Sequence, residues 1–187
     1  MKIKEILSLA SFFRGNEETA GFIENGASSN APDEQKEVDK LTKCYESIAR
    51  EIASEYYALK KEEEFDVSDN KVKYSSFLLV PYQIISVKNQ DGQKEEFSAL
   101  PTYVCCKNGK KRITYSYMPT HFALEDDGDF TSTPIDKRVL AMAVASEAYL
   151  VEGLFDEAIL WQNRYKEALQ AAISPKKELK MPARMFI

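Results

Sequence analysis

The chain has 187 residues, of which 44% are hydrophobic and 11% aromatic, which is enough apolar surface for one domain with a core. Its formal net charge of −5 disfavours a general binder of the phosphate backbone, because such a protein needs a basic face. No apolar run approaches the roughly 20 residues of a membrane-spanning helix, so we expect a soluble protein with no membrane partner. The three cysteines, Cys44, Cys105 and Cys106, are interpreted as reduced thiols of a cytoplasm-like compartment.

The N-terminal residues predict a short helix on a connector. Apolar residues recur at helical spacing from Ile3 to Phe13, and Gly15 is placed to end the helix. Glu5 interrupts the apolar run and argues against a secretory signal. The next stretch is rich in Gly, Ser, Asn and Glu, which is typical of a flexible linker. Residues 1–32 are therefore expected to be a helix and connector that can detach from the rest.

A long helix is predicted to begin at Pro32, a residue that suits the first helical turn. Apolar residues then step by three or four positions from Val38 to Leu59. After Lys61 the apolar period falls from about 3.6 to about 2, which indicates strands. We expect an antiparallel β insert over residues 63–118.

Three hairpins can be predicted in this insert from their turn residues. A turn at residues 69–70 would pair Val67 with Val72, and a turn at residues 91–92 would place Lys88 opposite Glu95. A turn at residues 108–109 would pair residues 104 and 113. In that third hairpin the pattern places Val104, Cys106, Ile113, Tyr115 and Tyr117 on one face, with Cys105 and Arg112 on the other.

Two helices are predicted at the C-terminal end. The first is expected to begin near Thr133 and Pro134, and to end at Gly153 in a left-handed conformation. The second runs to Ile173. Leu150, Val151 and Ile159 belong to the apolar positions of this pair. Because two amphipathic helices cannot bury both stripes alone, the long helix is expected to complete a bundle with them.

These elements predict an α+β fold, in which a long helix and a C-terminal helical hairpin form a bundle that carries the inserted hairpins. Residues 33–173 would form this domain. Residues 174–187 are expected to be an extended arm with basic residues and an apolar tip, namely Lys176, Lys177, Lys180, Arg184, Met185, Phe186 and Ile187.

The candidates for chemistry are weak. His121 precedes acidic residues and could form an acid/base pair, but no nucleophile motif accompanies it. Asp126, Asp127 and Asp129 are interpreted as a solvated loop, since a calcium hand needs a closing Glu that is missing here. The cysteines lack zinc-site spacing. The basic turn at residues 107–112 is interpreted as solvated, with contact to nucleic acid or an acidic partner as the alternative. We therefore predict no catalytic residue, no metal ligand and no cofactor.

Tyrosines crowd the β insert and its entrance. Tyrosine gives a large contact area with a polar handle, so it serves both cores and protein interfaces. The two interpretations stay open at this stage. The tyrosines that we assign as interface candidates are Tyr56, Tyr57, Tyr103, Tyr115 and Tyr117.

The order of elements resembles a known family. The long helix ends in "REIASEYYALKKEEEF", and the final helices read "LAMAVASEAYLVEGLFDEAILWQNRYKEAL". This layout, over residues 33–173, is similar to the head-to-tail connector (adaptor) proteins of tailed bacteriophages, which are head-completion proteins. Only the end of the long helix and the final helix pair carry the likeness closely. Three hairpins would be a large insert for the family.

The resemblance implies a viral structural protein without catalysis. Identical copies, commonly twelve, would form a ring below the portal, extend the DNA channel and attach tail or neck proteins. DNA would pass through without specific binding. The protein would be made in the bacterial host cytoplasm and would end in the neck of the virion. The alternatives are an α+β protein-binding or regulatory module that uses the tyrosine-rich sheet, and a small hydrolase around His121.

Overall fold

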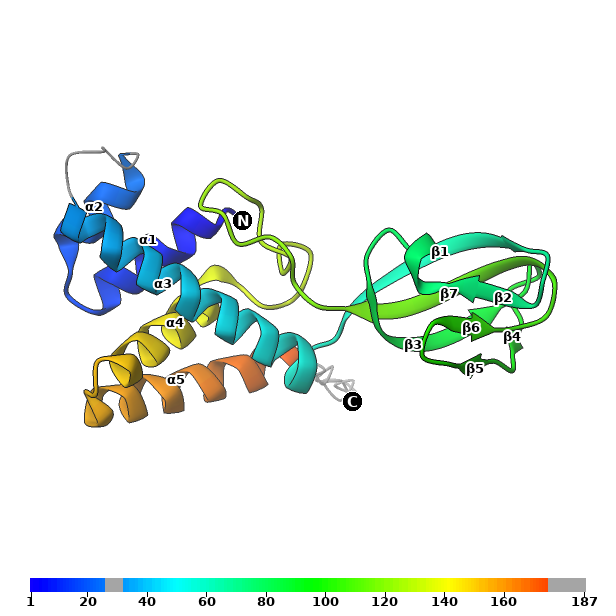
Figure 1. The fold of residues 1–187 in the computed structure, drawn as a ribbon. Helices are drawn as coiled ribbons and strands as arrows, with labels where there is room; N and C mark the ends of the chain where they lie inside the picture. Colours follow the sequence, from blue (N-terminus) through cyan, green and yellow to red (C-terminus); the bar gives the residue numbers. More distant parts are fainter. Residues whose placement is uncertain (26–31, 175–187) are drawn as a thin grey trace, which may run out of the picture.

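The computed structural model describes residues 1–25 and 32–174, and the α+β class expected from the sequence is confirmed. Figure 1 shows a helical part and a β part that are joined by two extended segments. Each part has a hydrophobic core of its own. Within the described residues no helix combines the length and the apolar character needed to cross a bilayer.

The helical part contains α1 to α5. Their bounds are α1 Ile3–Phe13, α2 Glu17–Glu24, α3 Pro32–Glu51, α4 Lys137–Val151 and α5 Phe155–Ile173, and a π-helical turn, Ile52–Tyr56, follows α3. The long helix thus begins at Pro32 as predicted. Gly15 and Gly153 end α1 and α4 with φ of +74° and +78°, the left-handed conformation that glycine adopts without a steric penalty.

The start of α4 differs from the prediction. The helix begins after Asp136, whose carboxylate accepts a hydrogen bond of 2.9 Å from the backbone N–H of Val139. Residues near Thr133 and Pro134 form turns before it. An aspartate cap satisfies one of the free N–H groups at a helix start, and this local bond decides the boundary.

The N-terminal segment is also corrected by the structure. Ile3, Ile6, Leu7 and Ala10 of α1 are fully buried in the helical core, whereas Phe12 is exposed. Residues 17–24, expected to be linker, form α2, which Asn16 caps by accepting from the N–H of Thr19. The apolar residues at helical spacing in α1 therefore form the buried face of a core helix, and α1 cannot detach from the helical part.

The β part consists of two antiparallel sheets. One has the strand order β1-β7-β3-β4 and the other β2-β6-β5. The strand bounds are β1 Leu59–Val67, β2 Lys71–Lys73, β3 Pro81–Lys88, β4 Lys94–Glu95, β5 Ser98–Ala99, β6 Tyr103–Cys105 and β7 Gly109–Tyr117. Apolar residues from both sheets meet in one core that includes Val67, Val104, Ile113 and Tyr115.

The predicted pairing of the first and third hairpins is wrong. β1 pairs along its whole length with β7, from Leu59 opposite Tyr117 to Val67 opposite Gly109. β2 and β6 pair with each other in the second sheet, where Val72 lies opposite Val104. The local turns exist, but each carries the chain into the other sheet. The predicted faces still hold, since Val104, Cys106, Ile113 and Tyr115 are buried and Arg112 is exposed.

The second hairpin forms with a register shifted by one residue. Val87 lies opposite Glu95, and Lys88 lies opposite Lys94. The loop has three residues, because the N–H of Asn89 donates to the carbonyl of Gln93 at 2.9 Å and Gly92 has a φ of +79°. A left-handed glycine after a type I turn produces this longer loop.

Candidate interaction surfaces

The surroundings of His121 are those of a structural turn. Its Nδ1 lies 3.2 Å from Asp129 Oδ1. The other carboxylate oxygen of Asp129 accepts from the backbone N–H groups of Thr120 and His121, at 3.1 and 3.2 Å. Asp129 is nearly buried, whereas the imidazole is 55% exposed. The carboxylate therefore organises the loop before α4. In the part of the chain that the structure describes, no three His, Cys, Asp or Glu side chains are grouped as metal ligands.

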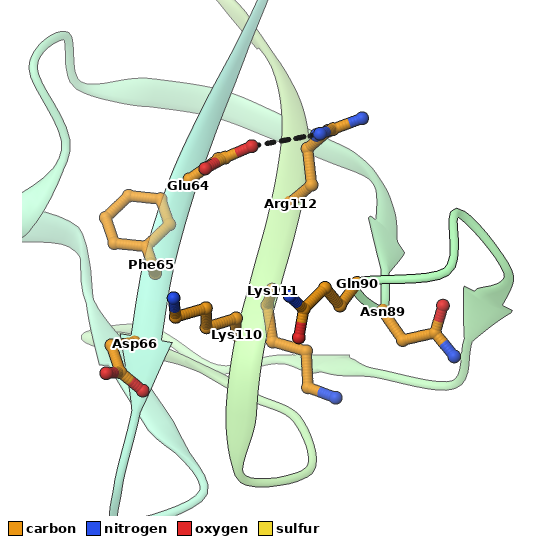
Figure 2. Close-up of a pocket in the computed structure, with 8 residues that line it drawn as sticks. All are labelled: Glu64, Phe65, Asp66, Asn89, Gln90, Lys110, Lys111 and Arg112. Atoms are coloured by element: carbon orange, nitrogen blue, oxygen red, sulfur yellow. Dashed lines mark hydrogen bonds and ion pairs between the residues drawn. The ribbon is translucent and has the colours of Figure 1, made fainter.

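Two of the four basic residues at the basic turn are paired with carboxylates. A cavity of about 390 Å³ lies beside this turn. Figure 2 shows the residues that line this cavity, which come from β1, β7 and the loop at Asn89 and Gln90. Lys111 is buried and lies 2.8 Å from Glu95, and Arg112 lies 2.9 Å from Glu64. The neighbouring carboxylates neutralise these two cations, whereas Lys107 and Lys110 are exposed and form no ion pair with any described residue.

Tyr115 is corrected from an interface candidate to a core residue. Its ring is fully buried and packs edge to face on Phe77, with centroids 5.0 Å apart. Its hydroxyl donates to Glu63, and burial together with that bond raises the pKa of Tyr115 to about 12. The phenol thus stays protonated and serves as a donor inside the β part.

Three of the other tyrosine candidates come together where the helical and β parts join. Tyr56, Tyr57 and Tyr117 line a cavity of about 410 Å³ with Asp129 and residues on either side. Tyr57 and Tyr117 also pack against the helical core. Tyr103 lies elsewhere, half-buried in the second sheet, with the Lys71 ammonium 4.9 Å from its ring centroid. These four residues do not form one surface.

The arm candidates lie outside the described residues. They are Lys176, Lys177, Lys180, Arg184, Met185, Phe186 and Ile187.

The turn between α4 and α5 carries an exposed apolar surface that sequence reasoning missed. We call it the tip surface. Its six residues are each 44% to 62% exposed, and they are Leu150, Val151, Leu154, Phe155, Ile159 and Leu160. Three of them had been counted among the apolar helix positions, but α5 buries only Ala158, Tyr165 and Leu169. The signal in the sequence was the excess of apolar residues over one stripe in "LVEGLFDEAIL".

The tip surface is held in a fixed conformation. At Gly153 the N–H of Leu154 donates to the carbonyl of Tyr149 at 2.9 Å, and the N–H of Gly153 to that of Leu150 at 3.1 Å, which is the Schellman pattern. Glu152, at the end of α4, forms ion pairs with Arg14 beyond α1 and with Lys40 of α3. Burial by itself would raise the pKa of Glu152, but the hydrogen bonds from Lys40 and Arg14 outweigh it and lower that pKa.

A second exposed apolar surface lies at the start of β3. We call it the loop surface, and it consists of Leu78, Val80, Tyr82 and Ile85, with Val80 the most exposed at 81%. The loop before β3 is held by hydrogen bonds to side chains of β1 and β7. The N–H of Leu78 donates to the Glu63 carboxylate at 3.1 Å, and the N–H of Leu79 to the Tyr115 hydroxyl at 3.4 Å. The buried Tyr115 thereby fixes the loop that presents Leu78 and Val80.

The edge of β3 is open over most of its length. β4 pairs only with Val87 and Lys88, which leaves residues 81–86 without a described strand on that side. Two register shifts against β7 and the missing N–H of Pro81 make this edge a poor template for another strand. Its exposed side chains are therefore the feature available for contact.

Comparison of the chain with known protein families and with curated proteins finds no match.

Proposed function

We propose that this chain is a structural subunit of a phage or prophage head-to-tail connector. In this role copies form a ring below the portal, extend the DNA channel and offer an attachment surface to tail or neck proteins. The observation that carries the proposal is the presence of two separate exposed apolar surfaces on one chain, the tip surface and the loop surface. Large exposed apolar patches on a folded protein mark sites of association.

The residues that carry the family resemblance occupy structural positions. Trp161 stacks on Phe13 with ring centroids 5.0 Å apart, and Tyr165 is buried in the helical core. The six residues of the tip surface lie within the resembling stretch of the final helices. This motif forms a helix pair whose turn is apolar and exposed. Such an arrangement supports a protein that acts by binding other proteins.

The negative charge of the subunit suits a DNA conduit. With a net charge of −5 the chain repels the phosphate backbone, so DNA can slide past it. The ion pairs of Lys111 and Arg112 support the same role, because they reduce the positive charge of the basic turn.

The test is assembly on a portal. The full chain is mixed with the purified portal oligomer of the phage or prophage that encodes it, and the complexes are viewed by electron microscopy. The proposal expects a ring of many copies stacked coaxially on the portal. A chain that binds no portal oligomer, or binds as a single copy, would contradict it. Retention of the chain by DNA at physiological salt would contradict the conduit role.

The protein-binding module remains the second candidate, and the loop surface favours it. Leu78, Val80 and Tyr82 are exposed on an anchored loop of the β part, as expected of a docking site for a single protein partner. Such a module would stay monomeric at every concentration and on the portal, so the same assembly experiment separates the two functions.

A further inference from the structure

We infer that copies of this chain join head to tail, with the tip surface of one copy against the loop surface of the next. The inference rests on the proposed function and specifies it, because a ring requires a contact between two different surfaces that closes by rotation.

The areas of the two surfaces match what an interface between copies needs. From the exposed fractions, the tip surface presents roughly 600 Å² and the loop surface roughly 500 Å² of apolar area, at or near the upper limit for a patch on a typical monomer. A standard interface buries about 1,600 Å² in all, of which about 60% is apolar. The two surfaces together therefore supply the apolar area of one interface of standard size.

One copy cannot join its own two surfaces. The tip surface lies at the α4–α5 turn, and α5 runs from there toward the β part (Figure 1). With 19 residues α5 is roughly 28 Å long. The loop surface begins at the near end of the β part, since Pro81 lies opposite Tyr117 and Tyr117 opposite Leu59 at the start of β1. A helix length separates the surfaces, so the two surfaces of one copy cannot meet each other.

Both surfaces are fixed before they meet. The tip is held by the Schellman turn at Gly153 and by the ion pairs of Glu152, and the loop by Glu63 and Tyr115. Because little conformational entropy is lost on contact, apolar burial is converted into affinity efficiently. Phe155 and Val80, the most exposed large side chains of the helix α5 and of the loop, are the expected centres of the contact.

A complementation experiment with two variants tests the inference. Phe155→Glu disables the tip surface and leaves the loop surface intact, and Val80→Glu does the reverse. Each substitution places a charge in an apolar contact and should weaken association at least 30-fold or so. Phe12→Glu is the matched control, since Phe12 is 59% exposed on α1 and belongs to neither surface. Circular dichroism and thermal unfolding verify that all three variants are folded.

Sedimentation velocity of the full chain gives the readout. Wild type and Phe12→Glu should associate beyond dimers as concentration rises, and each disabled variant should stay monomeric alone. An equimolar mixture of the two should form one-to-one dimers and nothing larger, because only one tip and one loop surface remain to meet.

Three results would overturn the inference. Either variant forming dimers alone would show contact between like surfaces, and a mixture that stays monomeric would show that the surfaces do not meet. A wild type that is monomeric at all concentrations would do the same. If that wild type still forms a ring on the portal, the proposed function stands and only the head-to-tail contact is wrong.

Discussion

The two helices of the C-terminal pair use their apolar residues differently. In α4, nine of the 15 residues are buried, whereas in α5 only three of 19 are, and Phe155, Ile159 and Leu160 in its first two turns are exposed. Both sequences have helical apolar spacing. A helix that carries more apolar residues than it buries is typical of a site that binds another molecule. We therefore assign α4 to the core and propose that the start of α5 binds a partner.

A matched pair of leucines tests the difference most strongly. Leu140 of α4 is fully buried and Leu160 of α5 is 52% exposed. Leu140→Ala should lower the free energy of unfolding by about 2–5 kcal/mol, because it removes buried methyl groups and leaves a cavity. Leu160→Ala should change it by less than about 0.5 kcal/mol. Urea unfolding of monomeric protein measures both, and equal losses would erase the distinction between the helices.

The ion pairs at the end of α4 predict a pH dependence. Arg14→Ala should cost about 1.5–3 kcal/mol of stability at neutral pH, since Glu37 and Glu152 lose a charged donor. The pKa of Glu152 is lowered in the folded state, so its stabilisation is present above the unfolded value of about 4.3 and is lost as pH falls through the lower folded value.

The acid side of the stability curve checks this assignment. In Arg14→Ala the loss of stability below about pH 4.3 should be smaller than in wild type, because the pKa of Glu152 returns toward its ordinary value. Lys137→Ala is the control, since Lys137 forms an exposed pair with Glu5. If Arg14→Ala loses stability below about pH 4.3 to the same extent as wild type, the ion pair between Arg14 and Glu152 does not cause this pH dependence.

A substitution at Tyr165 is expected to increase the stability of the protein. It is one of the few buried residues of α5, and its hydroxyl has no hydrogen-bond partner among the described residues. Tyr165→Phe should raise the free energy of unfolding by about 1 kcal/mol, because it removes an unsatisfied buried polar group at nearly constant shape. Thermal unfolding measures the shift, and a destabilised variant would reveal a partner for the hydroxyl.

Removal of residues 175–187 should have the smallest effect on the monomer. We propose that this basic, apolar-tipped arm contacts an adjoining subunit. We therefore expect a chain ending at Ser174 to keep its circular dichroism and its unfolding midpoint while losing ring closure or portal docking. Titration of the portal with both chains measures the docking. An unaltered docking affinity would refute this role for the arm.

Local chemistry in the sequence predicted local structure well. Pro32, Gly15 and Gly153 mark helix boundaries as expected, and the alternation of β7 placed Ile113 and Arg112 on opposite faces. Strand pairing failed because the turn residues describe only the chain near them, whereas the β1–β7 ladder joins segments about 40 or more residues apart, whose fit depends on two sheets sharing one core.

The interaction surfaces were hidden for a related reason. Tyr115 and Tyr103 were both interface candidates, although the strand alternation already placed Tyr115 on the face of Ile113, which the structure buries. Ile159 and Tyr165 likewise both fit the apolar spacing of α5, but only one side of that helix is covered by the helical part. Tyr165 lies on the covered side and is buried, whereas Ile159 is exposed. The spacing of apolar residues in the sequence shows which residues can be buried. Which of them are buried depends on the helices and strands that pack against the element.

The most direct test of assembly through unlike surfaces is a reconstruction of the chain on its portal by electron microscopy, at a resolution that separates α5 from the β part. We predict a closed ring in which Phe155 of each copy lies against Val80 of its neighbour. A ring in which both residues face solvent, or a complex with one copy of the chain, would contradict it.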